Sequence, residues 1–206
     1  IRDRLESGYQ KLTADTDFPM SQHQNAWGIN DDITFDHLYQ MLKDRRDSPW
    51  HTAFLTLSSH EPFEVPYHRL KEKQPNAFAF TDHCLGEFVE RIRKTPVWNN
   101  LLIVCLPDHG FYYPAEGNGH DARIHHIPML WLGGAVKQPM VINQVMNQSD
   151  LAATLLAQLG IDHSEFNFSR NILSTTYTYP FAYWTFGGGF AFADSTGVTS
   201  VSYTHL

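Results

Sequence analysis

Leu101-Leu-Ile-Val-Cys-Leu-Pro-Asp-His-Gly110 is the stretch of this chain that decides its fold. Its six apolar residues, two of them β-branched, have the length and composition of a strand buried on both faces. The run ends at Pro107 and Gly110, which favour a turn, so Asp108 and His109 are expected on a loop directly after the strand. Because ligand sites in open α/β sheets form beyond the carboxyl ends of strands, these two residues are candidate site residues.

A carboxylate beside an imidazole suits a divalent ion such as Mn²⁺ or Zn²⁺. Side chains on a regular strand alternate between faces, so Asp108 and His109 reach one ion only if the backbone has turned. The alternative is a strand-end turn in which both residues only cap backbone groups. Two ligands also fall short of the three that a catalytic ion normally has. No activated Ser, Thr or Cys is evident at a strand-to-helix turn.

Composition and charge limit the kinds of partner. The chain has 206 residues, is 42% hydrophobic and carries a formal charge of −7 without a Lys/Arg run. It is therefore expected to fold, and to bind small molecules or lipid headgroups rather than nucleic acid or an anionic membrane surface. Cys84 and Cys105 have neither metal-site nor disulfide spacing, which indicates buried free thiols.

The N-terminus gives no targeting signal. No apolar run approaches the roughly 18 residues of a membrane span, and Ile1-Arg-Asp-Arg4 has no signal-peptide features and no initial Met. We therefore expect a fragment whose targeting information, if any, lies upstream.

Helical and strand patterns alternate along the chain. A helix is predicted over 35–42 with Thr34 as its N-cap, and an amphipathic helix over about 76–94. A third helix is predicted after Ser149, ending at Gly160. Strands are predicted over 51–59, 101–106 and, with a polar entry, 123–134, followed by an aromatic, Gly-rich β-hairpin within 177–203. This order predicts a layered α/β fold with a mostly parallel sheet, flanking helices and a C-terminal β-hairpin, without a linker that splits the chain.

Histidines recur where predicted strands meet loops. His60 follows the strand over 51–59, His109 follows the strand over 101–106, and His125 and His126 precede the core of the last strand. This arrangement suggests one polar cluster at one sheet edge, in which a metal and imidazoles bind a tetrahedral anion. Glu61 and Glu64 flank His60 and are interpreted as solvated loop carboxylates, with a role in the site as the alternative.

Six motifs follow one another along the chain: Trp27-Gly-Ile-Asn-Asp31, Leu57-Ser-Ser-His-Glu-Pro-Phe63, Thr81-Asp82 with Gly86-Glu-Phe88, Pro107-Asp-His-Gly110, Ile127-Pro-Met-Leu-Trp-Leu-Gly133, and Ser149-Asp-Leu-Ala-Ala-Thr-Leu-Leu-Ala-Gln-Leu-Gly160. In this order they resemble the C-terminal half of the catalytic domain of lipoteichoic acid synthase-like phosphoglycerol transferases. These enzymes belong to the sulfatase and alkaline phosphatase superfamily. The resemblance covers about residues 8–197, so residues 1–206 are expected to be the C-terminal part of one such domain. Residues 200–206 depart from the family pattern and resemble adapter read-through, so a non-native tail is an alternative there.

The resemblance assigns roles to residues of the matching motifs. Asp108 and His109 match metal ligands, usually for Mn²⁺ or Mg²⁺, with Zn²⁺ as a further possibility. His60 matches a histidine that contacts the substrate phosphate or headgroup. His125 resembles an anion-binding histidine of the phosphoethanolamine transferases, although the adjacent His126 leaves the register open. Trp27 is a candidate for lining the headgroup pocket, with simple packing as the alternative.

In this family a glutamate completes the metal site and a threonine is the covalently phosphorylated nucleophile. Both lie in the N-terminal half of the domain, after membrane helices, and we expect them upstream of this chain. The resemblance implies ping-pong phosphoryl transfer from a lipid phosphodiester at the cell membrane, with the catalytic domain periplasmic or extracellular. The chain alone is expected to be inactive. A sulfatase or phosphodiesterase hydrolase acting on a phosphodiester or sulfate ester is one alternative, and a non-catalytic binding domain is another.

Overall fold

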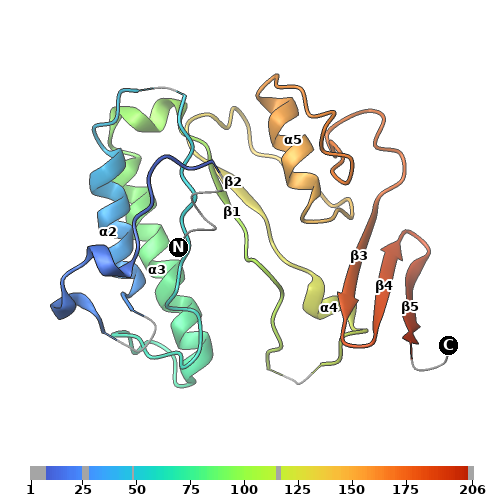
Figure 1. The fold of residues 1–206 in the computed structure, drawn as a ribbon, viewed down its shortest axis with the longest axis horizontal. Helices are drawn as coiled ribbons and strands as arrows, with labels where there is room; N and C mark the ends of the chain where they lie inside the picture. The colour runs from blue at the N-terminus through green and yellow to red at the C-terminus, as the bar shows by residue number, and fades with distance from the viewer. Residues whose placement is uncertain (1–7, 25–27, 48, 115–116, 204–206) are drawn as a thin grey trace. The chain divides into compact units, whose positions relative to one another are not determined.

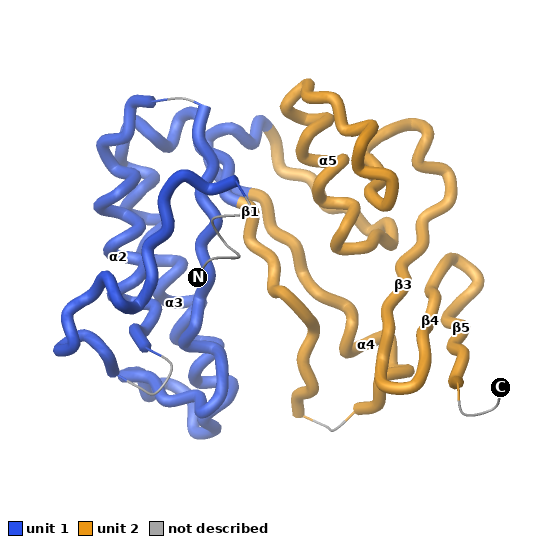
Figure 2. Tube along the Cα trace, viewed as in Figure 1, with its two compact units in different colours: residues 1–103, 132–137 blue, residues 104–131, 138–206 orange. Residues whose placement is uncertain are grey.

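The structure is a computed structural model that describes residues 8–24, 28–47, 49–114 and 117–203. It divides into two compact units, residues 1–103 with 132–137 and residues 104–131 with 138–206 (Figure 2). The division into compact units does not test whether residues 1–206 are the C-terminal part of one sulfatase-like catalytic domain. That assignment concerns the relationship to a protein family, and it stays a prediction. Among the described residues, no helix combines the length and apolarity needed to cross a membrane.

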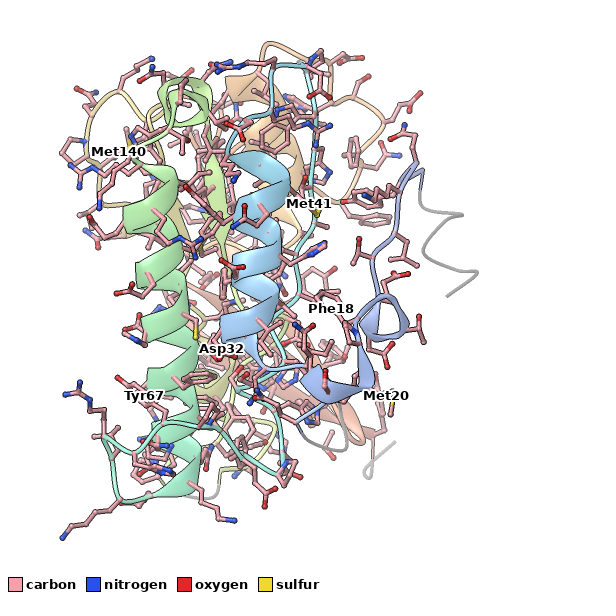
Figure 3. All side chains as sticks on the ribbon, turned by 90° about the vertical axis from the view of Figure 1, so that its left-hand side faces the viewer. Phe18, Met20, Asp32, Met41, Tyr67 and Met140 are labelled. Carbon is pink, nitrogen blue, oxygen red and sulfur yellow. The ribbon has the colours of Figure 1, made fainter. Side chains whose placement is uncertain are left out.

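Two packed helices, α2 (Asp31–Leu42) and α3 (Lys73–Ile92), form the core of the first unit (Figures 1 and 3). The buried cluster draws one stripe from each helix and one residue from the segment that follows α3: Phe35, Leu38, Leu42, Phe80, Cys84, Phe88, Ile92 and Leu101. Each large apolar side chain buried here contributes about 1.5–3 kcal/mol. Short 3₁₀ helices, η1 (Asp15–Asp17), η2 (Met20–Gln22) and η3 (Pro96–Asn100), flank this pair in sequence. The helical periodicity therefore identified the helix pair correctly.

Helix α2 begins earlier than predicted. Thr34 was expected to be the N-cap, but Asn30 occupies that position and Thr34 lies in the first turn, where its hydroxyl faces the Asp31 carbonyl at 3.3 Å. The backbone N–H of Asp31 donates to Ser58 Oγ at 2.9 Å. The hydroxyl that satisfies the start of the helix thus comes from a distant segment, which local sequence patterns do not reveal.

Helix α3 agrees with the sequence-based prediction within a few residues. Pro75 lies in its first turn, where the missing backbone N–H costs no intrahelical hydrogen bond. Thr95 precedes Pro96 and is extended, with φ −104° and ψ 156°, as a residue before proline prefers. The helix therefore ends before η3 begins.

The strand predicted over 51–59 is absent from the described part of the chain. Residues 51–57 have no assigned strand or helix, and a turn follows at 58–60. β-rich composition alone does not make a strand, because a strand requires a partner for its backbone groups.

The central strand is shorter than its apolar run. It forms β1 (Ile103–Cys105), which pairs with β2 (Leu130–Leu132) in a two-stranded sheet. The predicted strand over 123–134 is confirmed only at β2, because residues Ala122–His125 form the helical turn α4. Asp121 caps that turn by accepting from Arg123 N at 3.0 Å, which explains its helical start.

The second unit contains α5 (Asp150–Gln158) and a three-stranded antiparallel sheet (Figure 1). Its strands are β3 (Phe181–Phe186), β4 (Gly189–Asp194) and β5 (Gly197–Ser202). The predicted C-terminal hairpin is therefore present as β3–β4 and is extended by β5, with Trp184 opposite Ala191 and Ala191 opposite Ser200.

The ends of α5 follow the prediction only in part. Ser149 is the N-cap, but its hydroxyl donates to Phe168 O at 3.3 Å, and Asp150 Oδ2 instead accepts from Asn147 N at 2.9 Å. Gly160 lies after the helix with φ 68°, which confirms the predicted C-terminal glycine. Both cysteines are free thiols; Cys84 is buried and Cys105 is half-buried.

Candidate functional site

Asp108 and His109 lie on the loop that follows β1, as predicted, and both are exposed. The exposed fraction is 84% for the Asp108 side chain and 70% for His109. Asp108 Oδ2 and His109 Nε2 are 3.8 Å apart, so the backbone has turned and the two side chains face the same space. Asp108 Oδ1 also accepts from the backbone N–H of His109 at 3.0 Å. This bond agrees with the alternative interpretation, in which the residues of the turn cap backbone groups. The structure therefore combines a capped turn with a convergent pair of donor atoms.

The tautomer of His109 follows from its backbone contact. His109 Nδ1 lies 2.8 Å from Gly110 O, and a carbonyl oxygen only accepts, so Nδ1 carries the proton. In the neutral ring, Nε2 then keeps its lone pair and faces Asp108. Metal-binding histidines usually donate their other ring N–H to a carbonyl or carboxylate in this way.

The donor pair fits a divalent ion. Ligand atoms that are each about 2.1 Å from a shared ion lie at most about 4.2 Å apart. The observed separation of 3.8 Å is within that limit. Within residues 8–24, 28–47, 49–114 and 117–203, no group of three or more His, Cys, Asp or Glu side chains has a metal-binding arrangement. Asp108 and His109 thus offer two candidate donor atoms, fewer than the three protein ligands that a catalytic ion normally has.

Gly110 is required for a close backbone approach. A Cβ at this position would lie 1.5 Å from Ile124 O and 3.3 Å from His125 Cα. The loop with Asp108 and His109 therefore packs directly against α4. Sequence reasoning assigned Gly110 to the turn, whereas the structure shows that it also allows this contact.

His125 is held by contacts that the sequence did not indicate. Its ring stacks on Trp184 of β3, with the ring centroids 4.9 Å apart and an angle of 25° between the ring planes. His125 Nε2 lies 3.2 Å from Gly119 O, and Trp184 Nε1 donates to the same oxygen at 2.9 Å. The Nε2–H group is thus engaged, and Nδ1 can donate to an anion only when the ring carries both protons. Anion binding by the half-buried His125 or by the exposed His126 stays a prediction.

His60 belongs to the first unit and lies in a compact turn. Its backbone N–H donates to Leu57 O at 3.0 Å, and Phe63 N donates to His60 O at 2.9 Å. His60 Nδ1 lies 3.0 Å from Glu61 O, so Nδ1 is the protonated nitrogen and Nε2 keeps the lone pair of the neutral ring. Phe63 packs edge-on against Phe78 of α3 at 6.1 Å between centroids. Both ends of the turn are therefore anchored.

The other predicted residues have different outcomes. Trp27 lies outside the described residues. Glu61 is exposed, and Glu64 forms a 3.6 Å ion pair with Lys73 at the surface, in keeping with solvated carboxylates. A concavity of about 340 Å³ on α2 and α3 contains none of the predicted site residues; Asp32 and Tyr67, labelled in Figure 3, are among its lining.

Sequence reasoning missed the side chains that hold the Asp108 loop. Gln148 Nε2 donates to Pro107 O at 2.8 Å. The adjacent Asn147 brackets the Tyr183 backbone of β3, accepting from its N–H at 2.8 Å and donating to its carbonyl at 3.1 Å. The segment before α5 thus connects the loop after β1 with the antiparallel sheet. The spacing of these residues along the chain gave no signal for this.

With this geometry in place, comparison with known proteins gives the relationship. The sulfatase family model matches residues 4–161. The chain belongs to the sulfatase family. This sulfatase-family chain is 24% identical over 165 residues to phosphoglycerol transferase I of Xanthomonas campestris, covering 74% of the chain and 24% of the relative. It is 23% identical over 184 residues to a lipoteichoic acid synthase-like protein of Bacillus subtilis, covering 76% of the chain and 30% of the relative. The chain thus spans about a quarter to a third of the length of these relatives.

Solved structures confirm the fold class. A protein of the alkaline phosphatase superfamily from Vibrio parahaemolyticus superposes with a TM-score of 0.80 at 19% identity, covering 97% of this chain and 50% of that one. The lipoteichoic acid synthase LtaP from Listeria monocytogenes gives a TM-score of 0.78 at 16% identity, with coverages of 98% and 59%. The predicted α/β fold of the alkaline phosphatase and sulfatase type is therefore confirmed, as is the resemblance to phosphoglycerol transferases.

Proposed function

We propose that this chain is part of a metal-dependent transferase that moves a phosphoglycerol-type headgroup from a lipid phosphodiester. The observation that carries the proposal is the convergent pair after β1, with Asp108 Oδ2 and His109 Nε2 3.8 Å apart. The similarity to phosphoglycerol transferase I and to a lipoteichoic acid synthase-like protein supports the substrate class.

The proposed metal ligands are Asp108 and His109, and Mn²⁺ is the preferred ion, with Mg²⁺ and Zn²⁺ as alternatives. A bound divalent ion would neutralise charge on the phosphoryl oxygens. Asp108 supplies a carboxylate oxygen, and His109 supplies Nε2 because its Nδ1–H is held by Gly110 O. The remaining ligand is proposed to come from outside these residues.

The proposed anion contacts are imidazole groups. His60 Nδ1 lies 3.0 Å from Glu61 O, and the ring is proposed to donate to a substrate oxygen through Nε2 when it carries both protons. His125 donates from Nδ1 when its ring carries both protons, because its Nε2–H is engaged by Gly119 O. His126 and Trp27 complete the proposed substrate-binding set.

The covalent step is proposed to use a threonine outside this chain. Its hydroxyl oxygen bonds to phosphorus and loses its proton, while the bond from phosphorus to the lipid oxygen breaks. The lipid leaves as diacylglycerol after taking up a proton. An acceptor hydroxyl or water then displaces the threonine oxygen from phosphorus. The proposed location is the outer side of the cell membrane, with anchoring by helices that precede these residues.

A hydrolase acting on sulfate esters or phosphodiesters is the second candidate, because the sulfatase family model matches residues 4–161. In transfer an acceptor hydroxyl attacks phosphorus or sulfur in the last step, whereas in hydrolysis water does. Which of the two can enter the site decides between the reactions. Substrate tests distinguish the two candidates.

The experiment uses the full-length protein that contains this chain, phosphatidylglycerol vesicles and Mn²⁺, with diacylglycerol release as the readout. Asp108→Asn and His109→Gln should each lower the rate by roughly 100-fold or more, because each removes a metal ligand. Glu165→Gln, which changes an exposed carboxylate of the same unit, is the control and should keep the rate. Hydrolysis of p-nitrophenyl sulfate without diacylglycerol release would favour the sulfatase reading.

A further inference from the structure

Asp31, the first residue of α2, is a fully buried carboxylate at 0% exposure. It directly precedes Asp32, which is labelled in Figure 3 near the start of that helix. Burying a carboxylate is costly unless hydrogen bonds compensate the lost hydration. The contacts of Asp31 show which groups provide that compensation.

Three donors from two other segments converge on the Asp31 carboxylate. Oδ1 accepts from the backbone N–H groups of Leu57 at 2.8 Å and Ser58 at 3.2 Å. Oδ2 accepts from the hydroxyl of Thr81 in α3 at 2.6 Å. These hydrogen bonds to an ionised acceptor are stronger than those between neutral groups. The carboxylate therefore joins α2, α3 and the segment at Leu57.

Ser58 returns the contact. Its hydroxyl accepts from the backbone N–H of Asp31 at 2.9 Å, and Ser58 is 3% exposed. Asp31 and Ser58 thus hold each other in both directions, as in a capping box whose members are far apart in sequence. The two backbone bonds to Asp31 fix the peptide units on both sides of Leu57.

The turn with His60 starts at those peptide units. Leu57 N–H is held by Asp31, and the Leu57 carbonyl accepts from His60 N at 3.0 Å. The orientation of the Leu57 peptide units and the position of the His60 backbone are therefore coupled. His60 Nδ1 is then held by Glu61 O at 3.0 Å, which orients the ring.

We propose that Asp31, with Thr81 and Ser58, positions His60 for binding the phosphoryl group of the substrate. This inference rests on the proposed function, in which His60 contacts the substrate. An apolar residue of similar size would fill the space without the cost of burying a charge, but it would not fix three donors from two segments. Asp31 is a positioning residue, because it acts through His60 and does not itself contact the substrate.

The test measures kinetics of the full-length protein with bis(p-nitrophenyl) phosphate as the probe and Mn²⁺ present. Thr81→Val removes the hydroxyl that Asp31 accepts from, and Thr81→Ser keeps it. Thr81→Val and Asp31→Asn should raise KM by about tenfold with kcat nearly unchanged, because a displaced His60 weakens substrate binding in ground and transition state alike. Thr81→Ser should retain the original KM. A loss of folded enzyme would instead lower apparent kcat and leave KM unchanged.

Combination with His60→Ala separates the inference from the proposed function. If Asp31 acts through His60, the double variant Asp31→Asn/His60→Ala should have the KM of His60→Ala alone, because coupled residues are not additive. Two results would overturn the positioning role only, and both include a raised KM in His60→Ala. In the first, KM is unchanged in Asp31→Asn and Thr81→Val. In the second, the KM increases of Asp31→Asn and His60→Ala multiply in the double variant. Unchanged KM in His60→Ala would overturn the proposed role of His60, and the inference with it.

Discussion

The side-chain amide of Gln148 donates a hydrogen bond to the carbonyl oxygen of Pro107 at 2.8 Å. This bond ties the peptide directly before Asp108 to the segment that leads into α5. The same segment holds β3 through Asn147 and Tyr183. The position of the Asp108–His109 pair therefore depends on residues that are distant in sequence.

Gln148→Ala should lower the free energy of unfolding by about 1 kcal/mol, the usual net contribution of one hydrogen bond. Urea denaturation measures this change. Gln144→Ala, which truncates an exposed glutamine four residues earlier, is the matched control and should have almost no effect. Equal losses in the two variants would argue against a specific role for the bond to Pro107.

Asp150→Ala should cost about 3–5 kcal/mol, because it leaves the Arg170 guanidinium without its buried partner. The Asp150 side chain is 0% exposed, and its Oδ2 lies 2.5 Å from Arg170 Nη2. The guanidinium also stacks over Phe181, with Arg170 Cζ 3.6 Å from the ring centroid. Chemical denaturation of the variant measures the loss. Asp162→Ala removes an exposed carboxylate just after α5 and should change stability far less. A small loss in Asp150→Ala would contradict the structural role assigned to this pair.

Gly110→Ala should destabilise the chain by about 1–3 kcal/mol, because the new methyl group overlaps the Ile124 carbonyl and the backbone must shift. Gly187→Ala is the control, since no atom lies within 4 Å of a Cβ at that position. Thermal melting of both variants compares the two sites. Equal melting temperatures would show that the loop and α4 do not pack as closely as described.

Cys84 should make stability depend on alkaline pH. Burial, followed by the charges of Asp31 and Asp32, raises the pKa of this thiol from 9.0 to about 12. The unfolded chain therefore releases the thiol proton near pH 9 while the folded chain retains it until about pH 12. The contribution is complete below about pH 9 and is lost as the pH rises toward 12. Urea denaturation across this range should show a steeper decline for the natural chain than for Cys84→Ala, and identical slopes would contradict the raised pKa.

Local patterns predicted the helices better than the strands. The 3.6-residue period placed α3 and α5, because each carries its own apolar stripe. The start of α2 was missed because its first N–H is capped by Ser58. The prediction of a strand over 51–59 was wrong, because β-rich composition does not show whether a neighbouring strand is available for pairing. The extension of the hairpin by β5 was missed for the same reason.

The candidate site shows the same division between local and distant information. Asp108 and His109 were predicted because strand, turn and ligands are contiguous in sequence. Trp184, which stacks on His125, and Gln148, which holds Pro107, come from distant elements and carry no local motif. Asp31 was quoted only as part of a motif, because its burial becomes evident only in the fold.

The most direct test of the central claim is Mn²⁺ binding by the full-length protein, followed by electron paramagnetic resonance. The natural protein should bind Mn²⁺ and show coupling to an imidazole nitrogen, and His109→Gln should lose that coupling. Asp108→Asn should weaken binding, whereas His120→Gln, a change in the same unit outside the pair, should not. Unchanged affinity and nitrogen coupling in both the Asp108 and His109 variants would contradict the assignment of this pair as metal ligands.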